Sequence, residues 1–331
     1  MKIPGLVTHL IGGEIILKNT EMKYQGIIEN YKEAYYIGSQ GPDLFFYDFL
    51  TFFKKDTRNL GQILHKQNIN RFFGEMVREA KAFPTSMERQ IAFSYIAGYI
   101  THYTLDINTH PYIYYKSGFS KKGRQPFQLR YSLLHRKLES NIDNMIHEAF
   151  TENGSPRDEK IWHLVEADDK QTDVIAKLLS KSISVAYDRN VTVSDVKLSL
   201  KMMMYAIKAL NLFSTRGSNF KNIGEDLKVC EKQFTNLIEG TCNSPLDFLN
   251  LKKGDWCSPW NDTLVHETSF VDLYSLGLNE GIGLVNNFGL FVDEKISYQD
   301  FLELVQNRSL KTGVDSDLDI IFKYHDIIFN K

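Results

Sequence analysis

A helical repeat of apolar side chains is the feature that most constrains the fold of this chain. Apolar and aromatic residues recur at helical spacing through residues 87–107 and 127–150, and Pro126 stands where a proline favours the first turn of a helix. No long alternation of apolar and polar residues, which would indicate a strand, stands out in this part of the chain. The sequence therefore predicts an all-α structure for the first 150 residues.

Glycines and prolines mark where further helices end. Residues 25–43 are predicted as one helix that stops in a stretch of glycine and proline, and residues 68–83 as another that ends before a proline. Residues 115–126 and 152–160 have the glycine, serine and proline content of loops. Helical spacing resumes over residues 193–213, so we expect the second half of the chain to be helical as well.

The composition is that of a folded globular protein, with 331 residues of which 43% are hydrophobic and 24% charged. Single cores stop growing beyond ~250–300 residues, so one large domain or two smaller ones would both fit this length. We predict a helical core over residues 1–150, which residues 151–331 complete and extend. A formal net charge of -2 argues against a dedicated nucleic-acid binder, because such proteins usually carry a basic contact face.

Neither the cysteines nor the N-terminus indicates secretion. The three cysteines show no CxxC spacing that would suggest a redox pair or a zinc knuckle. The N-terminal residues lack the small-residue cleavage site of a signal peptide, and no uncharged apolar run approaches the ~20 residues that span a bilayer. We therefore expect a cytoplasmic protein without a transmembrane segment.

The stretch ITHYTLDINTHPY, residues 100–112, places His102, Asp106 and His110 four residues apart each time. A helix turns about 100° per residue, so a step of four returns a side chain to nearly the same face one turn further along. These three metal-competent side chains are thus predicted to form one stripe on a helix.

A second pair, His135 and Glu139, has the same spacing on the following helix. Any one such pair is more often a surface ion pair worth a few tenths of a kcal/mol. Five imidazole and carboxylate groups on two neighbouring helices are the mixture that zinc takes in catalytic sites, however. The spacing alone leaves a metal site and chance pairing as competing interpretations.

The order of several short motifs resembles the bacterial zinc-dependent phospholipase C family, whose all-α fold is shared with the S1/P1-type nucleases. These motifs are THL, GSQGPDLFFYD, GQILHK, GYITHYTLDINTHPY and LLHRKLE, within roughly residues 5–150. The resemblance implies two or three zinc ions. It implies that Asp43, His65 and His102 hold one ion and that His110, His135 and Glu139 hold a second. It also implies that Asp106 bridges the first ion to a third, which His9 binds.

The resemblance implies hydrolysis of a phosphodiester, most simply a phospholipid at a membrane surface or its water-soluble fragment, with Asp43 orienting or deprotonating the attacking water. It does not extend to choline selectivity, because residues 1–8 contain no carboxylate to hold an ammonium group. The aromatic residues 45–47 could flank a substrate or simply pack in the core. Two alternatives stay open: an S1/P1-like nuclease or phosphodiesterase, and a non-catalytic helical interaction protein that metal stabilises.

Overall fold

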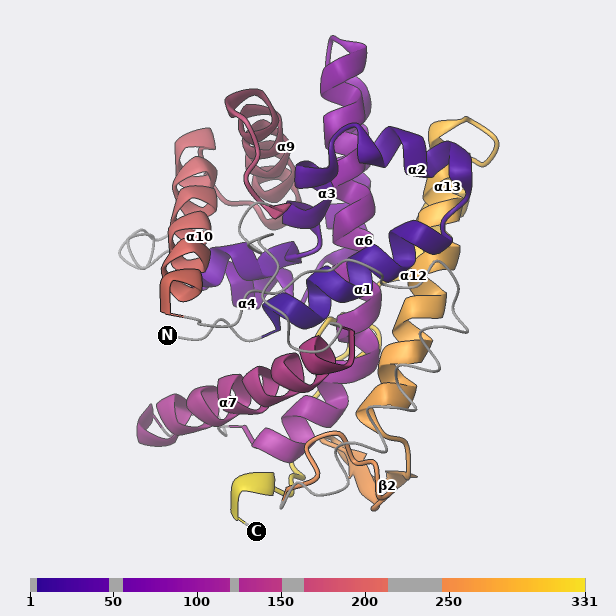
Figure 1. Ribbon diagram of the computed structural model, residues 1–331. Coiled ribbons are helices and arrows are strands. Elements are labelled where there is room, and N and C mark those ends of the chain that lie inside the picture. Colours follow the sequence, from indigo (N-terminus) through magenta and orange to yellow (C-terminus); the bar gives the residue numbers. More distant parts are fainter. Residues whose placement is uncertain (1–4, 48–55, 120–124, 151–163, 214–245, 331) are drawn as a thin grey trace.

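The protein is described by a computed structural model that covers residues 5–47, 56–119, 125–150, 164–213 and 246–330. Helices dominate these residues (Figure 1), and the predicted all-α class is confirmed. In the first 150 residues the helices are α1 (Leu6–Asn19), α2 (Met22–Glu29), α3 (Lys32–Gly38), the 3₁₀ helix η1 (Gly41–Phe46), α4 (Leu60–Leu64), α5 (Ile69–Ala82), α6 (Ser86–Ser117) and α7 (Gln125–Phe150). Later helices are α9 (Asp169–Tyr187), α10 (Val193–Phe213), α12 (Phe270–Val292), α13 (Tyr298–Val305) and the 3₁₀ helix η3 (Ile328–Asn330).

The 32-residue helix α6 runs through the middle of the molecule (Figure 1). It begins with a capping box, in which the Thr85 hydroxyl accepts from the backbone N–H of Glu88 and the Glu88 carboxylate accepts from the backbone N–H of Thr85. Helices α1, α3, α5, α7, α9 and α12 all pack against it. A buried helix surrounded in this way can present polar side chains to the interior from a rigid support.

Two glycines let α3 cross α6 at very close range. A Cβ atom on Gly98 would lie 1.9 Å from the carbonyl oxygen of Tyr35, and one on Gly38 would lie 2.1 Å from that of Tyr95. Any side chain at either position would therefore force the two backbones apart. The close crossing places Ser39, which follows α3, directly against α6.

The prediction of one helix over residues 25–43 is wrong. The chain forms α2, then breaks at Asn30 and Tyr31, where Tyr31 leaves the helical region (φ -139°, ψ 50°), and restarts as α3. The break redirects the chain so that α3 reaches the glycine contact with α6, and apolar spacing carries no information about such a change of direction. After α3, Gly41 adopts φ 50°, and a Cβ there would lie 2.4 Å from the His102 ring.

The other predicted helices are present in the structure, but the one predicted over residues 87–107 continues to Ser117 in α6. Residues 68–83 form α5, residues 127–150 lie in α7, and residues 193–213 form α10. Of the predicted loops, residues 152–160 lie outside the described residues, and so do residues 120–124 of the segment 115–126. The described part of that segment includes the end of α6 and the start of α7.

Sequence patterns did not predict the hairpin formed by β1 (Trp256–Ser258) and β2 (Asn261–His266). The two strands are antiparallel, with Trp256 opposite His266, and the register shifts between Cys257 and Ser258. A three-residue strand is too short for its alternation to be recognised, and all three residues of β1 are buried.

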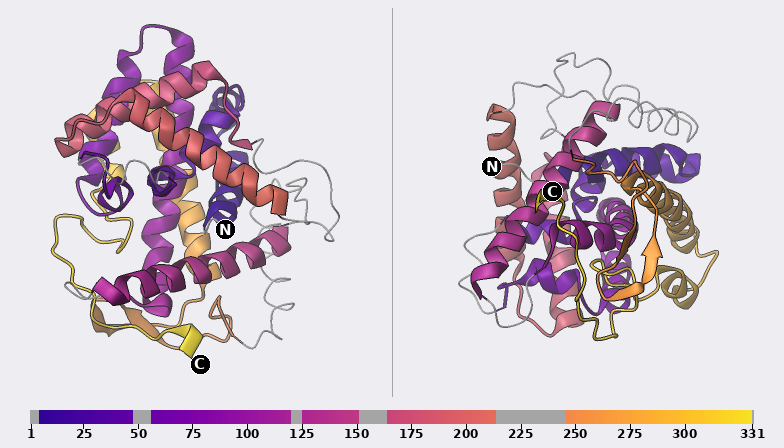
Figure 2. Two further views of the ribbon diagram at one scale, coloured as in Figure 1. Left: turned by 90° about the vertical axis from the view of Figure 1, so that its left-hand side faces the viewer. Right: turned by 90° about the horizontal axis from the view of Figure 1, so that it is seen from below.

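The C-terminal residues return to the helices formed by the first half of the chain. Asp326 donates its backbone N–H to the carbonyl of Tyr115 at 2.9 Å, and the Lys137 ammonium of α7 lies 4.4 Å from the centre of the Phe329 ring. Figure 2 shows this C-terminal end, in yellow, beside α7. In the part of the chain that the structure describes, no helix has both the length and the apolar composition needed to cross a membrane.

Candidate metal centre

The stripe on α6 converges as the spacing predicts. The Nε2 atom of His102 lies 3.0 Å from Asp106 Oδ2, and Nδ1 of His110 lies 3.4 Å from the same oxygen. All three side chains are buried. Asp106 is thus placed between two histidines, one turn before it and one turn after it on the same helix.

Helix α7 brings His135 and Glu139 to the same place. Glu139 Oε1 lies 3.1 Å from His135 Nε2 and 3.7 Å from His110 Nε2, so one carboxylate oxygen joins the two helices. The rings of His110 and His135 have their centres 5.8 Å apart. Nitrogen and oxygen atoms of His110, His135 and Glu139 all lie within 4.8 Å of one another.

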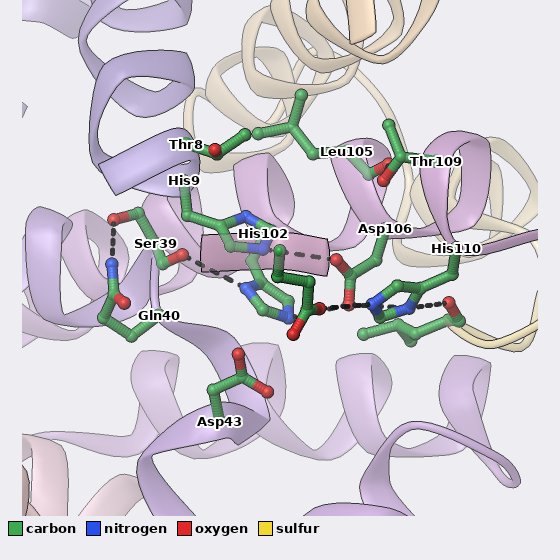
Figure 3. A network of polar contacts seen from close by, with 12 residues as sticks. Thr8, His9, Ser39, Gln40, Asp43, His102, Leu105, Asp106, Thr109 and His110 are labelled. Carbon is green, nitrogen blue, oxygen red and sulfur yellow. Dashed lines mark hydrogen bonds and ion pairs between the residues drawn. The ribbon is translucent and has the colours of Figure 1, made fainter. Parts of the chain in front are cut away.

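The other three predicted residues, His9, His65 and Asp43, come from different elements, and Figure 3 shows His9 and Asp43 on either side of His102. His9 of α1 places Nε2 3.3 Å from Asp106 Oδ1, and its ring stacks on that of His102 with centres 4.1 Å apart. His65, which follows α4, places Nε2 3.2 Å from Asp43 Oδ1 and 3.6 Å from Asp106 Oδ2. Asp43 lies in η1 and points toward His102 from the side opposite His9. The structure therefore brings all eight predicted residues into one cluster.

Backbone carbonyls hold three of the histidine rings by their Nδ1 atoms. His65 Nδ1 lies 2.6 Å from the Gly61 oxygen, His102 Nδ1 lies 3.2 Å from the Ser39 oxygen, and His110 Nδ1 lies 2.7 Å from the Leu310 oxygen. A carbonyl can only accept, so each Nδ1 carries a hydrogen, and in the neutral form of each ring Nε2 has a lone pair available to a metal. This is the arrangement by which proteins orient metal-ligating histidines.

The donor set fits zinc. Atoms that are about 2.0–2.2 Å from a tetrahedral ion lie roughly 3.3–3.6 Å from one another, and the nitrogen-to-oxygen distances above span that interval. Among the described residues, His102 Nε2 and Asp106 Oδ2 are buried without a hydrogen-bond partner. They face each other at 3.0 Å, and both are acceptors when the His102 ring hydrogen is on Nδ1. Buried polar atoms are normally satisfied, so two facing acceptors fit residues that would share a cation. Two further groups of atoms lie within 4.8 Å of one another, namely His9 with Asp43 and His102, and His65 with His102 and Asp106.

The pKa values of the clustered residues are shifted both by burial and by the charges of their neighbours. Burial alone would raise the pKa of Asp106, but the surrounding histidines hold it well below its usual value. Burial alone would lower the pKa of His110, but Asp106 and Glu139 raise it to about 9. Burial dominates for His102 and lowers its pKa, which favours the neutral form that binds metal.

A family comparison agrees with this geometry. Residues 8–189, more than half of the chain, match the zinc dependent phospholipase C family. The chain belongs to this family. The comparisons with curated proteins and with solved structures give no significant match.

All eight clustered residues lie inside the part of the chain that matches the zinc dependent phospholipase C family. The grouping of His110, His135 and Glu139 is the one that the sequence resemblance implied for one ion. Asp43 is close to His65, as the resemblance implied, and it also lies in a group with His9. Met1 lies outside the described residues.

Asp143 is a residue of the site that sequence reasoning missed. It is buried one turn after Glu139, and its Oδ1 accepts both the backbone N–H of Thr8 at 2.9 Å and the Thr8 hydroxyl at 2.6 Å. The start of α1 has no cap from its own Gly5, so Asp143 supplies one from α7. The contact fixes His9, the next residue, relative to Glu139. Only the one-turn spacing from Glu139 could have drawn attention to it.

Of the aromatic residues 45–47, Phe46 is the one that reaches solvent beside the cluster. Its side chain is 43% exposed, and its ring stacks on His65 with centres 5.4 Å apart. Tyr47 is buried and Phe45 is partly buried against the core. Core packing therefore accounts for two of the three residues, and Phe46 is positioned at the edge of the metal centre.

Proposed function

We propose that this chain is a zinc-dependent phosphodiester hydrolase of the phospholipase C type, which cleaves a phospholipid or a related diester. The observation that carries the proposal is the buried pair of unpartnered atoms, His102 Nε2 and Asp106 Oδ2, inside a cluster of five histidines and three carboxylates. Membership of the zinc dependent phospholipase C family supports zinc binding as the role of this cluster.

The eight clustered residues would hold the zinc. His110, His135 and Glu139 would form one ligand set. Asp43, His65 and His102 would form a second, and Asp106 with His9 would complete a third position. When bound, zinc lowers the pKa of a coordinated water toward ~7 and stabilises negative charge on phosphoryl oxygens. The proton transfers of the reaction depend on side chains of the protein itself.

Asp43 is the carboxylate best placed to accept a proton from the attacking water. Its side chain is 23% exposed, whereas that of Asp106 is 2% exposed and is surrounded by histidines. Only one of its oxygens, Oδ1, lies within 3.2 Å of His65 Nε2. The oxygen of the water forms a bond to phosphorus as its proton passes to Asp43. The bond from phosphorus to the alcohol oxygen breaks, and the proton held by Asp43 is transferred to the leaving alcohol.

A cavity of about 30 Å³ reaches the cluster between α1, α6 and α7. His9, Asp106, His110 and Glu139 contribute to its lining, along with Thr8 and Thr109. A water molecule needs about 10–15 Å³, so the cavity has room for one or two waters between the ligand sets.

The test combines zinc analysis with turnover on one sample. We expect the purified protein to contain zinc and to hydrolyse short-chain phospholipids, to lose activity on chelation, and to regain it with zinc. His102→Ala should lose both zinc and activity. His266→Ala is the matched control, because His266 lies in the hairpin, where its ring centre is 4.5 Å from that of Trp256. Hydrolysis of nucleic acid but not of lipid would favour the nuclease alternative, and zinc without any turnover would favour the non-catalytic one.

A further inference from the structure

His135 is the least buried of the five clustered histidines. Its side chain is 19% exposed, whereas those of the other four are at most 9% exposed. Its Nδ1 atom also differs from those of His65, His102 and His110, because it faces a side-chain hydroxyl instead of a backbone carbonyl. Ser117 Oγ lies 3.4 Å from this atom. Such a contact depends on the residue type at position 117, so a substitution can remove it.

Ser117 continues the stripe of predicted ligands on α6. It lies seven residues after His110, and seven residues of a helix return a side chain to within about 20° of its starting direction. Its side chain is buried, and α6 ends here, next to Gly118 with φ +78°. One face of α6 therefore carries three predicted ligands and, two turns further along, the hydroxyl that meets His135 of α7.

The hydrogen bonds of Ser117 determine the direction of its contact with His135. The hydroxyl donates to the Ile113 carbonyl at 2.7 Å, a bond that a helical serine commonly makes to the residue four positions earlier. A hydroxyl has only one hydrogen, so toward the His135 ring its oxygen acts as an acceptor. The ring hydrogen is then on Nδ1, and Nε2 of the neutral ring has the lone pair that a metal needs.

The opposite end of the same ring has a competing acceptor. His135 Nε2 lies 3.1 Å from Glu139 Oε1, so in the metal-free protein a hydrogen on Nε2 would be bonded to the carboxylate. Hydrogen bonds to a charged acceptor are roughly twice as strong as those between neutral groups. Without an acceptor at Nδ1 the ring would therefore favour the form in which a hydrogen blocks Nε2. The Ser117 hydroxyl offsets part of this preference.

Tyr114 restricts the ring of His135 as well. It lies one turn after His110 on α6, and its ring centre is 5.8 Å from that of His110 and 4.8 Å from that of His135. Phe322 in turn packs against Tyr114, with ring centres 5.0 Å apart. This packing keeps the His135 ring from turning away from the cluster, so loss of the Ser117 hydroxyl should act mainly on the position of the ring hydrogen.

We propose that Ser117 is a positioning residue of the metal centre, which places the ring hydrogen of His135 on Nδ1 and so keeps Nε2 available to an ion held with His110 and Glu139. The identity of this ion as zinc rests on the proposed function, but the tautomer of His135 is a property of the protein without metal. The effect is confined to one ligand set. Changing Ser117 should therefore weaken one zinc position and leave the others unchanged.

The test replaces Ser117 with alanine in the full chain and measures both the tautomer and the zinc affinity. Nitrogen-15 chemical shifts of the His135 ring in the metal-free protein, at a pH where the ring is neutral, give the fraction with the hydrogen on Nδ1. We expect Ser117→Ala to reduce this fraction and to weaken one zinc position about 10- to 100-fold, as is typical when a hydrogen-bond partner of a ligand is lost. Ser117→Thr keeps a hydroxyl and should restore both values.

Ser199→Ala is the matched control, because the buried Ser199 hydroxyl donates to the Asp195 carbonyl, also four residues earlier, at 3.2 Å. It lies on α10, which carries none of the eight clustered residues. Both alanine variants should lose similar stability without metal, but only Ser117→Ala should change the tautomer and the zinc affinity.

An unchanged tautomer fraction or an unchanged zinc affinity in Ser117→Ala would overturn the positioning role. Equal weakening of all zinc positions would overturn it too, because it would indicate a general loss of structure. The expected changes in a protein that binds zinc but cleaves no phosphodiester would support the positioning role and reject the proposed function.

Discussion

Residues 9–139 and residues 309–313 both build the metal centre, but they do so in different ways. The first region contributes side chains whose chemistry is visible in the sequence, namely the five histidines, Asp43, Asp106 and Glu139. The second contributes a hydroxyl and a backbone carbonyl, at Ser309 and Leu310. The comparison shows that candidate metal ligands can be recognised in the sequence by residue type, whereas the groups that orient them are identified only once the fold is known.

The largest effect should come from the first region. Asp43→Asn keeps an oxygen that can face metal but removes the proton acceptor, so turnover should fall about 10²–10⁴-fold while zinc content is kept. Glu139→Ala should instead lower zinc content, because it removes a ligand. Turnover and zinc are measured in both variants on one phosphodiester. If Asp43→Asn turned over at the parent rate with full zinc, Asp43 would not be the base.

Removal of zinc should destabilise both regions together. A ligand present at 100 times its Kd stabilises the native state by about 2.7 kcal/mol, which corresponds to a Tm decrease of roughly 5 °C on chelation. Hydrogen exchange should also accelerate at residues 309–313, because Leu310 is bonded to His110. An unchanged melting curve after verified zinc removal would show that metal does not support the fold.

Zinc affinity should depend on pH through His110. Its pKa is raised to about 9 in the metal-free protein, since Asp106 and Glu139 outweigh the effect of burial. The ring must therefore lose a proton before it can bind metal, and the affinity of the set with His135 and Glu139 should increase with pH up to about 9. One proton corresponds to about tenfold per pH unit. Calorimetry in buffers of different ionisation enthalpy measures the number of protons released when zinc binds. Zinc binding without proton release would contradict the prediction.

The smallest effect should come from the second region. Ser309→Ala removes the hydrogen bond to the His65 carbonyl and should weaken zinc binding about three- to tenfold, less than the loss of a direct partner of a ligand. Ser180→Ala is the control, because its hydroxyl donates to the Val191 carbonyl at 2.8 Å on α9. Both variants should lose similar stability, about 1 kcal/mol, but only the first should lose zinc affinity. Equal zinc affinities of the Ser309→Ala and Ser180→Ala variants would show that the C-terminal segment does not support the site.

The sequence predicted the fold class and the helices with strong apolar spacing, because burial of one helix face leaves a pattern that can be read locally. It did not predict the break between α2 and α3, since the contact of Gly98 with Tyr35 joins residues far apart in the chain. The spacing of His102, Asp106 and His110 likewise anticipated their convergence, because a single helix determines it.

The supporting contacts of the site were beyond sequence reasoning for a similar reason. The carbonyls of Ser39 and Leu310 are present in every residue type, so nothing in the sequence distinguishes them. Asp143 resembles any other helical aspartate until the start of α1 is seen to lie against it. The roles of individual residues as ligands or base stay predictions until zinc content and turnover are measured.

The bond from His110 to Leu310 also has a consequence for biosynthesis. All eight clustered side chains have been synthesised once residue 139 is added, but the carbonyl that orients His110 follows 171 residues later. At about 5–20 residues per second, ribosomes need about 10–30 s for that interval. The nascent chain therefore carries all eight clustered side chains before the carbonyl that orients His110 has been synthesised. Metal bound during translation would be held while His110 still lacks this hydrogen bond. The metal centre can reach its final geometry only after Leu310 has been added.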